Sequence, residues 1–470
     1  MEAMRRLRLL WFVLVIAAVS LPLTLLAGRS EGSESMEVTR VDADPAEQFA
    51  TSKGMRFYPG QPLILRVLLS NSTPSLSIGA NSRIKVLDDA GRVLGEWVPP
   101  VRADAAVDGV ALSSVSGKLR GKRFVLAPER EGLLRWNKRD YRGEFALSLG
   151  ANDRLVLLNH VELEDYLRGV VPAEMPPLWP TEAVKAQAVA ARTYAVQRAL
   201  QNHDAPFDLY ASTADQLYQG TGREHPASDA AIAETRGKVI TYQCEPIIAY
   251  YHSASGGRTR AGKLPYLASV ESPEESSHDS WQVELSLEEL ASALRKGGQD
   301  LGQIQMVSVS QDEGGLAIAA LQVRGSAGTS ELTPARLRSL IGVSVVKSPS
   351  FTVDIEGGLA LSREFREIHH WMRVDAVSAY REKEVKVRRC TVTSGKLTRP
   401  MYHTYYAVGV EQQPERIILH GGGYGHGVGM SQWGAKWMAE NGATWEEIVK
   451  HYYSGVEITD ISQLGTWGKL

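Results

Sequence analysis

A segment near the middle of the chain places the strongest constraint on its fold. Residues 181–202 read TEAVKAQAVAARTYAVQRALQN, with seven alanines and neither glycine nor proline, a composition with high helix propensity. Val184, Ala188, Ala191 and Ala195 recur at helical spacing on one face. Because these side chains are small, other elements can approach the helix closely. We therefore expect a packed helix at the centre of the fold.

The rest of the chain mixes strands and helices. Short alternating apolar runs such as RIKVL, RFVLA and EFALSL are typical of strands separated by turns. The sequences SLEELASALRK and TPARLRSLIG predict short helices, the second with Thr333 as its N-cap. Since the elements do not alternate as regular βαβ units, we expect an α+β fold. Mixed sheets would surround the alanine-rich helix in a single large domain with an inserted element.

Composition shifts predict how the chain is divided. We expect an export segment over residues 1–28, a polar linker over 29–56, the large domain over 57–458 and a tail over 459–470. The charged stretch from 355 to about 412 predicts an inserted strand-and-helix element within that domain.

The N-terminus indicates export. A basic start, MRRLR, precedes the apolar run LLWFVLVIAAVSLPLTLLAG, which is just long enough to cross a bilayer. Its end lacks a clean A-x-A site, which favours an uncleaved membrane anchor over a cleaved signal. The remainder would lie outside the cytoplasm. There, Cys244 and Cys390 either form one disulfide or stay as two buried thiols.

The segment VVPAEMPPLWP holds one acid, Glu174, among apolar residues and four prolines. An apolar pocket disfavours the charged carboxylate and raises its pKa, so such a glutamic acid can act as a general acid near neutral pH. The alternative is a surface-loop acid without a catalytic role. We expect the prolines to hold a rigid loop around Glu174, braced by the helix that follows.

A single acid narrows the chemistry. Ordinary glycosidases use two carboxylates, and this motif contains no second one. One acid suffices when the substrate supplies its own nucleophile, as in lytic cleavage of bacterial cell-wall glycan. There, the C6 hydroxyl of N-acetylmuramic acid closes on its own C1 and leaves a 1,6-anhydro end. The same carboxyl would first protonate the leaving oxygen and then take the C6 hydroxyl proton.

Three motifs, in order, carry a family resemblance. They are LEDYLRGVVPAEMPPLWPTEAVKAQAVAARTYAVQ, YYHSASGGRT and GGGYGHGVGMSQWGA, with a smaller match at ADQLYQG. From about residue 58 to about 457 the chain resembles the stage II sporulation protein D / amidase-enhancer family. The resemblance implies a lytic transglycosylase acting on peptidoglycan glycan strands already stripped of peptide stems, with Glu174 as catalytic residue. The alternative is a non-catalytic amidase enhancer that binds the wall and stimulates an N-acetylmuramoyl-L-alanine amidase.

The resemblance also implies which residues contact the substrate. Amide and aromatic groups suit a glycan groove, because sugars combine apolar faces with hydroxyl rims. Arg192 would either line the cleft or orient Glu174. The expected substrate-binding residues are Gln187, Arg192, Tyr251, His252, Ser253, His426 and Gln432. A serine hydrolase built on Ser253 is a further alternative, disfavoured because adjacent strand residues point to opposite faces.

Cofactors and nucleic acid are not expected. Some relatives carry a zinc site near the YYHSASGGRT motif, but here Arg258 and Leu264 stand in that stretch and no cysteine is near. His252 alone cannot form a closed tetrahedral site, so we predict no structural zinc. The net charge is −2 and neither a P-loop nor a G-x-G-x-x-G pattern is present, so we expect neither nucleic acid nor a nucleotide cofactor.

Overall fold

The structure is a computed structural model. It describes residues 62–273, 280–311, 318–362 and 409–464. The expected export segment, the linker, Cys390 and residues 363–408 of the expected insertion lie outside the described residues. Within the described ranges, no helix combines the length and the apolar character needed to span a membrane.

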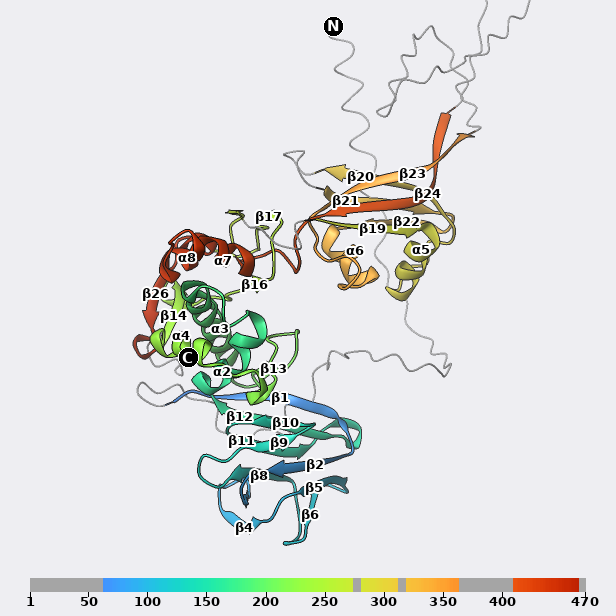
Figure 1. Ribbon diagram of the computed structural model, residues 1–470. Helices are drawn as coiled ribbons and strands as arrows, with labels where there is room; N and C mark the ends of the chain where they lie inside the picture. Colours follow the sequence, from blue (N-terminus) through green and yellow to red (C-terminus); the bar gives the residue numbers. More distant parts are fainter. Residues whose placement is uncertain (1–61, 274–279, 312–317, 363–408, 465–470) are drawn as a thin grey trace, which may run out of the picture. The chain divides into compact units, whose positions relative to one another are not determined.

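The first part of the chain forms two sheets that share one hydrophobic core (Figure 1). Their strands are β1 (Ile64–Thr73), β2 (Ser75–Ala80), β3 (Ile84–Leu87), β4 (Val93–Trp97), β5 (Val101–Ala106), β6 (Gly109–Ser114), β7 (Gly117–Gly121), β8 (Arg123–Pro128), β9 (Leu134–Trp136), β10 (Arg139–Tyr141), β11 (Glu144–Leu149), β12 (Leu155–Glu162) and β13 (Leu209–Tyr210). The larger sheet has the order β13-β1-β12-β11-β8-β3-β4, and the smaller has the order β10-β9-β2-β5-β6-β7. Alternating apolar residues create this core, because one face of each strand is buried.

Five of the helices that the structure describes pack together. They are α2 (Leu163–Glu174), α3 (Thr181–Gln201), α4 (Pro226–Glu234), α7 (Gln432–Glu440) and α8 (Trp445–Tyr452). Helix α3 contacts the other four, and its buried residues lie on all sides rather than on one stripe. The expected central helix and the α+β fold class are therefore confirmed, with the seven alanines of α3 allowing close approach from every direction.

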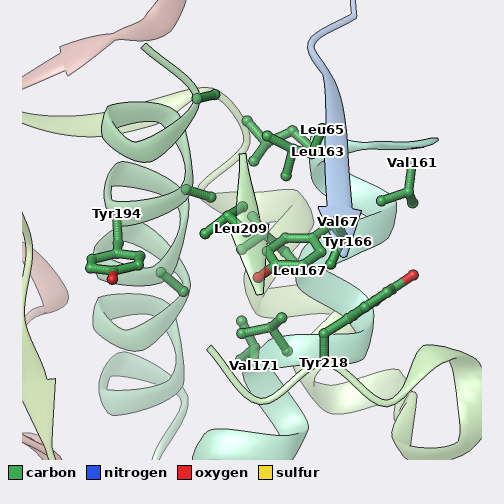
Figure 2. Close-up of a cluster of buried hydrophobic side chains, with 14 of the residues drawn as sticks. Leu65, Val67, Val161, Leu163, Tyr166, Leu167, Val171, Tyr194, Leu209 and Tyr218 are labelled. Carbon is green, nitrogen blue, oxygen red and sulfur yellow. The ribbon is translucent and has the colours of Figure 1, made fainter. Parts of the chain in front are cut away.

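Helix α2 joins the sheets to the helices. Figure 2 shows Tyr166, Leu167 and Val171 of α2 among Leu65 and Val67 of β1, and all five side chains are buried. Because α2 is packed on both β1 and α3, its last turn is held by the main core.

The expectation of a proline-held loop around Glu174 was wrong. Glu174 is the last residue of α2, and Pro172 lies inside that helix. A proline in the last turn removes only one intrahelical hydrogen bond. The helix still closes through Met175, whose N–H donates to the Val171 carbonyl at 3.0 Å. The loop of prolines begins only after the acid.

Short strands complete the part of the fold around α3. They are β14 (Lys238–Tyr242), β15 (Glu245–Pro246), β16 (Tyr251–His252), β17 (Gly257–Arg258), β18 (Glu271–Ser272), β25 (Met430–Ser431) and β26 (Glu457–Asp460). Strand β14 pairs with β15 through a tight turn that exposes Cys244, and on its other side with β26.

Residues between β18 and β25 form a second hydrophobic cluster. Its elements are β19 (Trp281–Ser286), α5 (Leu287–Lys296), β20 (Ile304–Gln311), β21 (Ile318–Gly325), β22 (Gly328–Leu332), α6 (Pro334–Ile341), β23 (Phe351–Ser362) and β24 (Gly409–Gly421). Both expected short helices are present, and the Thr333 side chain caps α6 by accepting from the N–H of Arg336. The described ends of the expected insertion lie in β23 and β24, which pair antiparallel from Phe351 with Gly421 to Ser362 with Gly409.

Candidate active site around Glu174

Glu174 is a half-buried carboxyl held by one hydrogen bond. Its Oε1 accepts from the backbone N–H of Leu217 at 2.8 Å. Burial raises the pKa of Glu174, and the Leu217 N–H offsets only part of that shift. The C-terminal end of α2 carries a partial negative charge, which also disfavours the ionised form. The carboxyl is thus fixed in orientation, and it keeps its proton to a higher pH than an ordinary glutamic acid does.

Gln216, next to Leu217 in the chain, fixes the hydroxyl of Tyr251. Its Nε2 donates to the Tyr251 hydroxyl at 3.1 Å and to the Ala191 carbonyl at 3.2 Å. Its Oε1 accepts from the Tyr166 hydroxyl at 3.2 Å. The Gln216 amide, which is fully buried, is therefore held by both of its polar atoms. One dipeptide positions both the acid and a neighbouring phenol.

The segment that carries this dipeptide is anchored on both sides. The Asp215 carboxylate accepts from the Tyr194 hydroxyl at 2.7 Å and from Arg198 Nε at 3.0 Å. Three residues on, the Tyr218 hydroxyl donates to Asn159 Oδ1 at 2.8 Å. None of these residues is predicted from the sequence to have a function. The only available signal was the short motif ADQLYQG.

Two motifs far apart in the sequence meet beside the acid. Strand β16 pairs in parallel with β25, which places Tyr251 opposite Met430 and His252 opposite Ser431. Glycines in the loop before β25 permit this approach. Gly429 has φ +73°, and a Cβ at this position would collide with the Tyr250 carbonyl. The YYHS and glycine-loop motifs thus form one unit.

The rings of His252 and His426 lie against each other within this unit, tilted by 52° and with centroids 5.6 Å apart. His252 is 4% exposed, and its Nδ1 lies 3.2 Å from the Val428 carbonyl. A carbonyl only accepts, so Nδ1 carries the proton and Nε2 presents a lone pair. No partner among the described residues binds that Nε2. Burial lowers the pKa of His252 to about 3, so the ring is neutral at physiological pH.

Gln187 of α3 and Gln432 of α7 also come together. Gln432 Nε2 lies 3.4 Å from Gln187 Oε1, and Gln187 Nε2 is a buried donor without a partner among the described residues. The Ser253 carbonyl accepts from the Trp433 N–H at 3.0 Å. No hydrogen bond in the described part of the chain joins Ser253 to His252, as a serine nucleophile would require.

Aromatic and apolar side chains follow the acid in the chain. Trp179, five positions after Glu174, packs edge-on against Trp433 at 4.9 Å between ring centroids. Leu178 is 80% exposed, although an apolar side chain gains nothing from contact with water. Lys436 Nζ lies 5.5 Å from the Trp433 ring centre. This surface offers the flat apolar faces against which sugar rings pack.

Arg192 lies apart from these groups. Its side chain is fully buried and forms a bidentate ion pair with Glu164, at 2.8 and 2.7 Å. The guanidinium also donates to the carbonyls of Ile232 and Lys238. Because its guanidinium is enclosed and paired with Glu164, Arg192 is placed to support the fold rather than to contact a substrate or orient Glu174. We therefore do not retain it in the proposed site.

Metal ligands do not cluster in the described ranges: no group of three or more His, Cys, Asp and Glu side chains there could hold an ion. The absence of a structural zinc stays a prediction.

Comparison with known proteins places the chain in a family. The family model for stage II sporulation protein matches residues 151–242, which include Glu174, α3 and Gln216. An uncharacterized protein of Brachyspira hyodysenteriae is 30% identical over 323 residues, covering 67% of this chain and 71% of that protein. Stage II sporulation protein D of Bacillus subtilis is 29% identical over 324 residues, covering 64% and 76%. An amidase enhancer of Bacillus subtilis is 27% identical over 316 residues, 62% of this chain but 40% of that protein.

The chain belongs to the stage II sporulation protein D / amidase-enhancer family. The predicted resemblance is confirmed. His252 and the glycine loop lie beyond the residues matched by the family model, so their place beside the matched region comes from the structure.

Proposed function

We propose that this protein acts in the bacterial cell wall as a lytic transglycosylase. It cleaves peptide-stripped peptidoglycan strands and leaves 1,6-anhydro-muramic ends, with Glu174 as the only acid and base. The relatives named for sporulation and for amidase enhancement support a cell-wall role. The observation that carries the finer proposal is the single half-buried carboxyl, fixed by the Leu217 N–H and surrounded by neutral polar groups.

The mechanism has two proton transfers at one carboxyl. Protonated Glu174 gives its proton to the glycosidic oxygen as the bond to C1 of N-acetylmuramic acid breaks. The resulting carboxylate then takes the proton of the C6 hydroxyl as that oxygen bonds to C1. The Leu217 N–H stabilises the carboxylate between these steps, and no second acid is needed because water is not the nucleophile.

The substrate would lie against the surfaces that the three motifs share. Tyr251, His252, Ser253, His426 and Gln432 contact the sugars in this proposal, together with Gln187. The Nε2 atoms of His252 and Gln187 leave one acceptor and one donor unsatisfied next to these motifs, although both side chains are buried in this structure. The exposed Leu178 and the pair formed by Trp179 and Trp433 support a sugar-binding face. The N-terminal segment would tether the enzyme to the membrane, with the rest outside the cytoplasm.

The main alternative is a non-catalytic amidase enhancer, which would bind the wall and stimulate a separate cell-wall amidase. Incubating the purified full-length protein with peptide-stripped strands, in the absence of any amidase, separates the two. Anhydro-muramic ends detected by mass spectrometry support the enzyme. Intact strands, together with stimulation of an added amidase, would establish the enhancer.

A second variant distinguishes a serine hydrolase built on Ser253 from the proposed enzyme. Ser253→Ala should keep substantial cleavage if Glu174 carries the chemistry, because Ser253 then contributes only a sugar contact. Complete loss in a folded Ser253→Ala protein, with activity retained in Glu174→Gln, would reverse the assignment.

A further inference from the structure

Arg260 is a half-buried cation without a protein partner. Within the described residues, no carboxylate, carbonyl or hydroxyl accepts a hydrogen bond from its guanidinium. The buried arginines elsewhere in this fold are paired, Arg66 with Asp208 and Arg192 with Glu164. An unpaired guanidinium removed from water is costly, and arginine stays charged in proteins. A half-buried guanidinium without a partner among the described residues is therefore available to bind an anion.

The position of Arg260 is fixed on the glycine loop. Its backbone N–H donates to the Gly427 carbonyl at 2.7 Å, and it forms a parallel bridge with Val428. A Cβ on Gly427 would lie 3.2 Å from Arg260 Cδ and 3.3 Å from its Cγ, so the aliphatic stem packs on the glycine backbone. Gly427 directly follows His426 in the chain. The unpaired charge is therefore tied to the same loop that supplies the proposed sugar contacts.

We propose that Arg260 binds the lactyl carboxylate of N-acetylmuramic acid and so makes the enzyme selective for peptide-stripped strands. This inference rests on the proposed function. In an intact strand that carboxyl is an amide to the peptide stem and carries no charge. Stripping the stem creates one carboxylate on each muramic acid, and a guanidinium fork suits a carboxylate better than any other side chain does.

A binding experiment tests the role of Arg260 without requiring catalytic turnover. Glu174→Gln protein, which keeps the site but cannot cleave, is titrated calorimetrically with soluble peptide-stripped glycan oligomers. The same oligomers are then used with every lactyl carboxylate converted to its methylamide. Because a charged hydrogen bond is lost, we expect the methylamide to bind about tenfold more weakly or worse, and Arg260→Gln to weaken binding of the natural oligomer by a similar factor. When the Arg260→Gln protein is titrated with the methylamide oligomer, the two losses of affinity should not add.

Two controls make the result specific. Arg258→Gln removes the same charge two residues away, from an exposed side chain that pairs with Glu271 at 3.2 Å, and should leave binding within about twofold. Oligomers that retain their peptide stems, which carry carboxylates of their own, test whether stem carboxylates replace the lactyl group. Their weak binding is expected, and equal binding that depends on Arg260 would overturn the lactyl assignment.

The outcomes separate this inference from the proposed function. Equal affinity for natural and methylamide oligomers, in a protein whose wild type cleaves strands, would overturn the role of Arg260 alone. Absence of any glycan binding would overturn both. A further readout needs no ligand: Arg260→Gln should unfold at a higher temperature than wild type, because it removes an unpaired, half-buried charge. A lower unfolding temperature would indicate a structural partner for Arg260 and contradict the inference.

Discussion

Glu174 is subject to two opposing influences, burial and the Leu217 N–H, and burial is the larger. Such a group keeps its proton to a higher pH than an ordinary glutamic acid and, once ionised, is stabilised by the same N–H that orients it. The orientation of the Glu174 carboxyl therefore depends on Leu217, which acts only through its backbone N–H.

The first prediction concerns stability against pH. Because the pKa of Glu174 is raised on folding, the wild type loses stability as pH rises from the ordinary glutamate pKa through the folded one. Glu174→Gln cannot titrate, and its amide oxygen can still accept from Leu217. We expect the variant to have the larger free energy of unfolding at neutral pH and no advantage below the ordinary glutamate pKa. Urea denaturation at several pH values measures this, and a difference independent of pH would contradict it.

The second prediction concerns Gln216. Gln216→Leu removes its bonds to Tyr251, Tyr166 and Ala191, and we expect kcat to fall about tenfold or more with a smaller change in KM, because the acid and the phenol lose their alignment. If the Leu217 N–H moves away from Glu174, the pKa of Glu174 rises further. The pH at which the rate changes with the protonation of Glu174 should then be higher than in the wild type. Tyr166→Phe, which removes one of those bonds, is the matched control. A uniform loss of activity at an unchanged pH profile would indicate unfolding instead.

At the scale of elements, α2 and α3 are joined by the ion pair between Glu164 and Arg192. Arg192→Met leaves Glu164 buried and unpaired, so we expect a loss of about 3–5 kcal/mol in the free energy of unfolding. Glu164→Leu in the same protein should restore part of that loss. Chemical denaturation gives the three values. A loss below about 1 kcal/mol, together with a raised KM, would instead favour a substrate role for Arg192.

Local sequence predicted some of these elements and not others. Helix α3 follows from alanine content and α6 from its Thr333 cap, because both signals lie within the element itself. The motif around Glu174 predicts the acid itself. Its N–H donor, Leu217, lies 43 positions from Glu174, and Glu164, the ion-pair partner of Arg192, lies 28 positions from Arg192. No short-range pattern shows such contacts. The end of α2 was missed because Pro172 resembles a helix breaker, whereas the last turn tolerates it.

At the scale of the whole molecule, the charged segment between β23 and β24 is separable in principle. Ser362 and Gly409 are register partners at the ends of antiparallel strands, so a two-residue Asn-Gly turn can join them. We expect a protein lacking residues 363–408, closed by this turn, to fold and to cleave peptide-stripped strands at a rate within about twofold of wild type. Thermal unfolding and a cleavage assay test this. Loss of cleavage in a folded protein would give that segment a part in the reaction.

The central claim is that one carboxyl serves both steps while the substrate supplies the nucleophile. The most direct measurement is digestion of peptide-stripped strands in ¹⁸O-labelled water, followed by mass spectrometry of the new ends. We predict muramic ends lighter than the hydrolysis product by one water, free of ¹⁸O, and reduced at least about a hundredfold in rate by Glu174→Gln. Reducing ends that carry ¹⁸O, or anhydro ends formed equally fast by Glu174→Gln, would contradict the account.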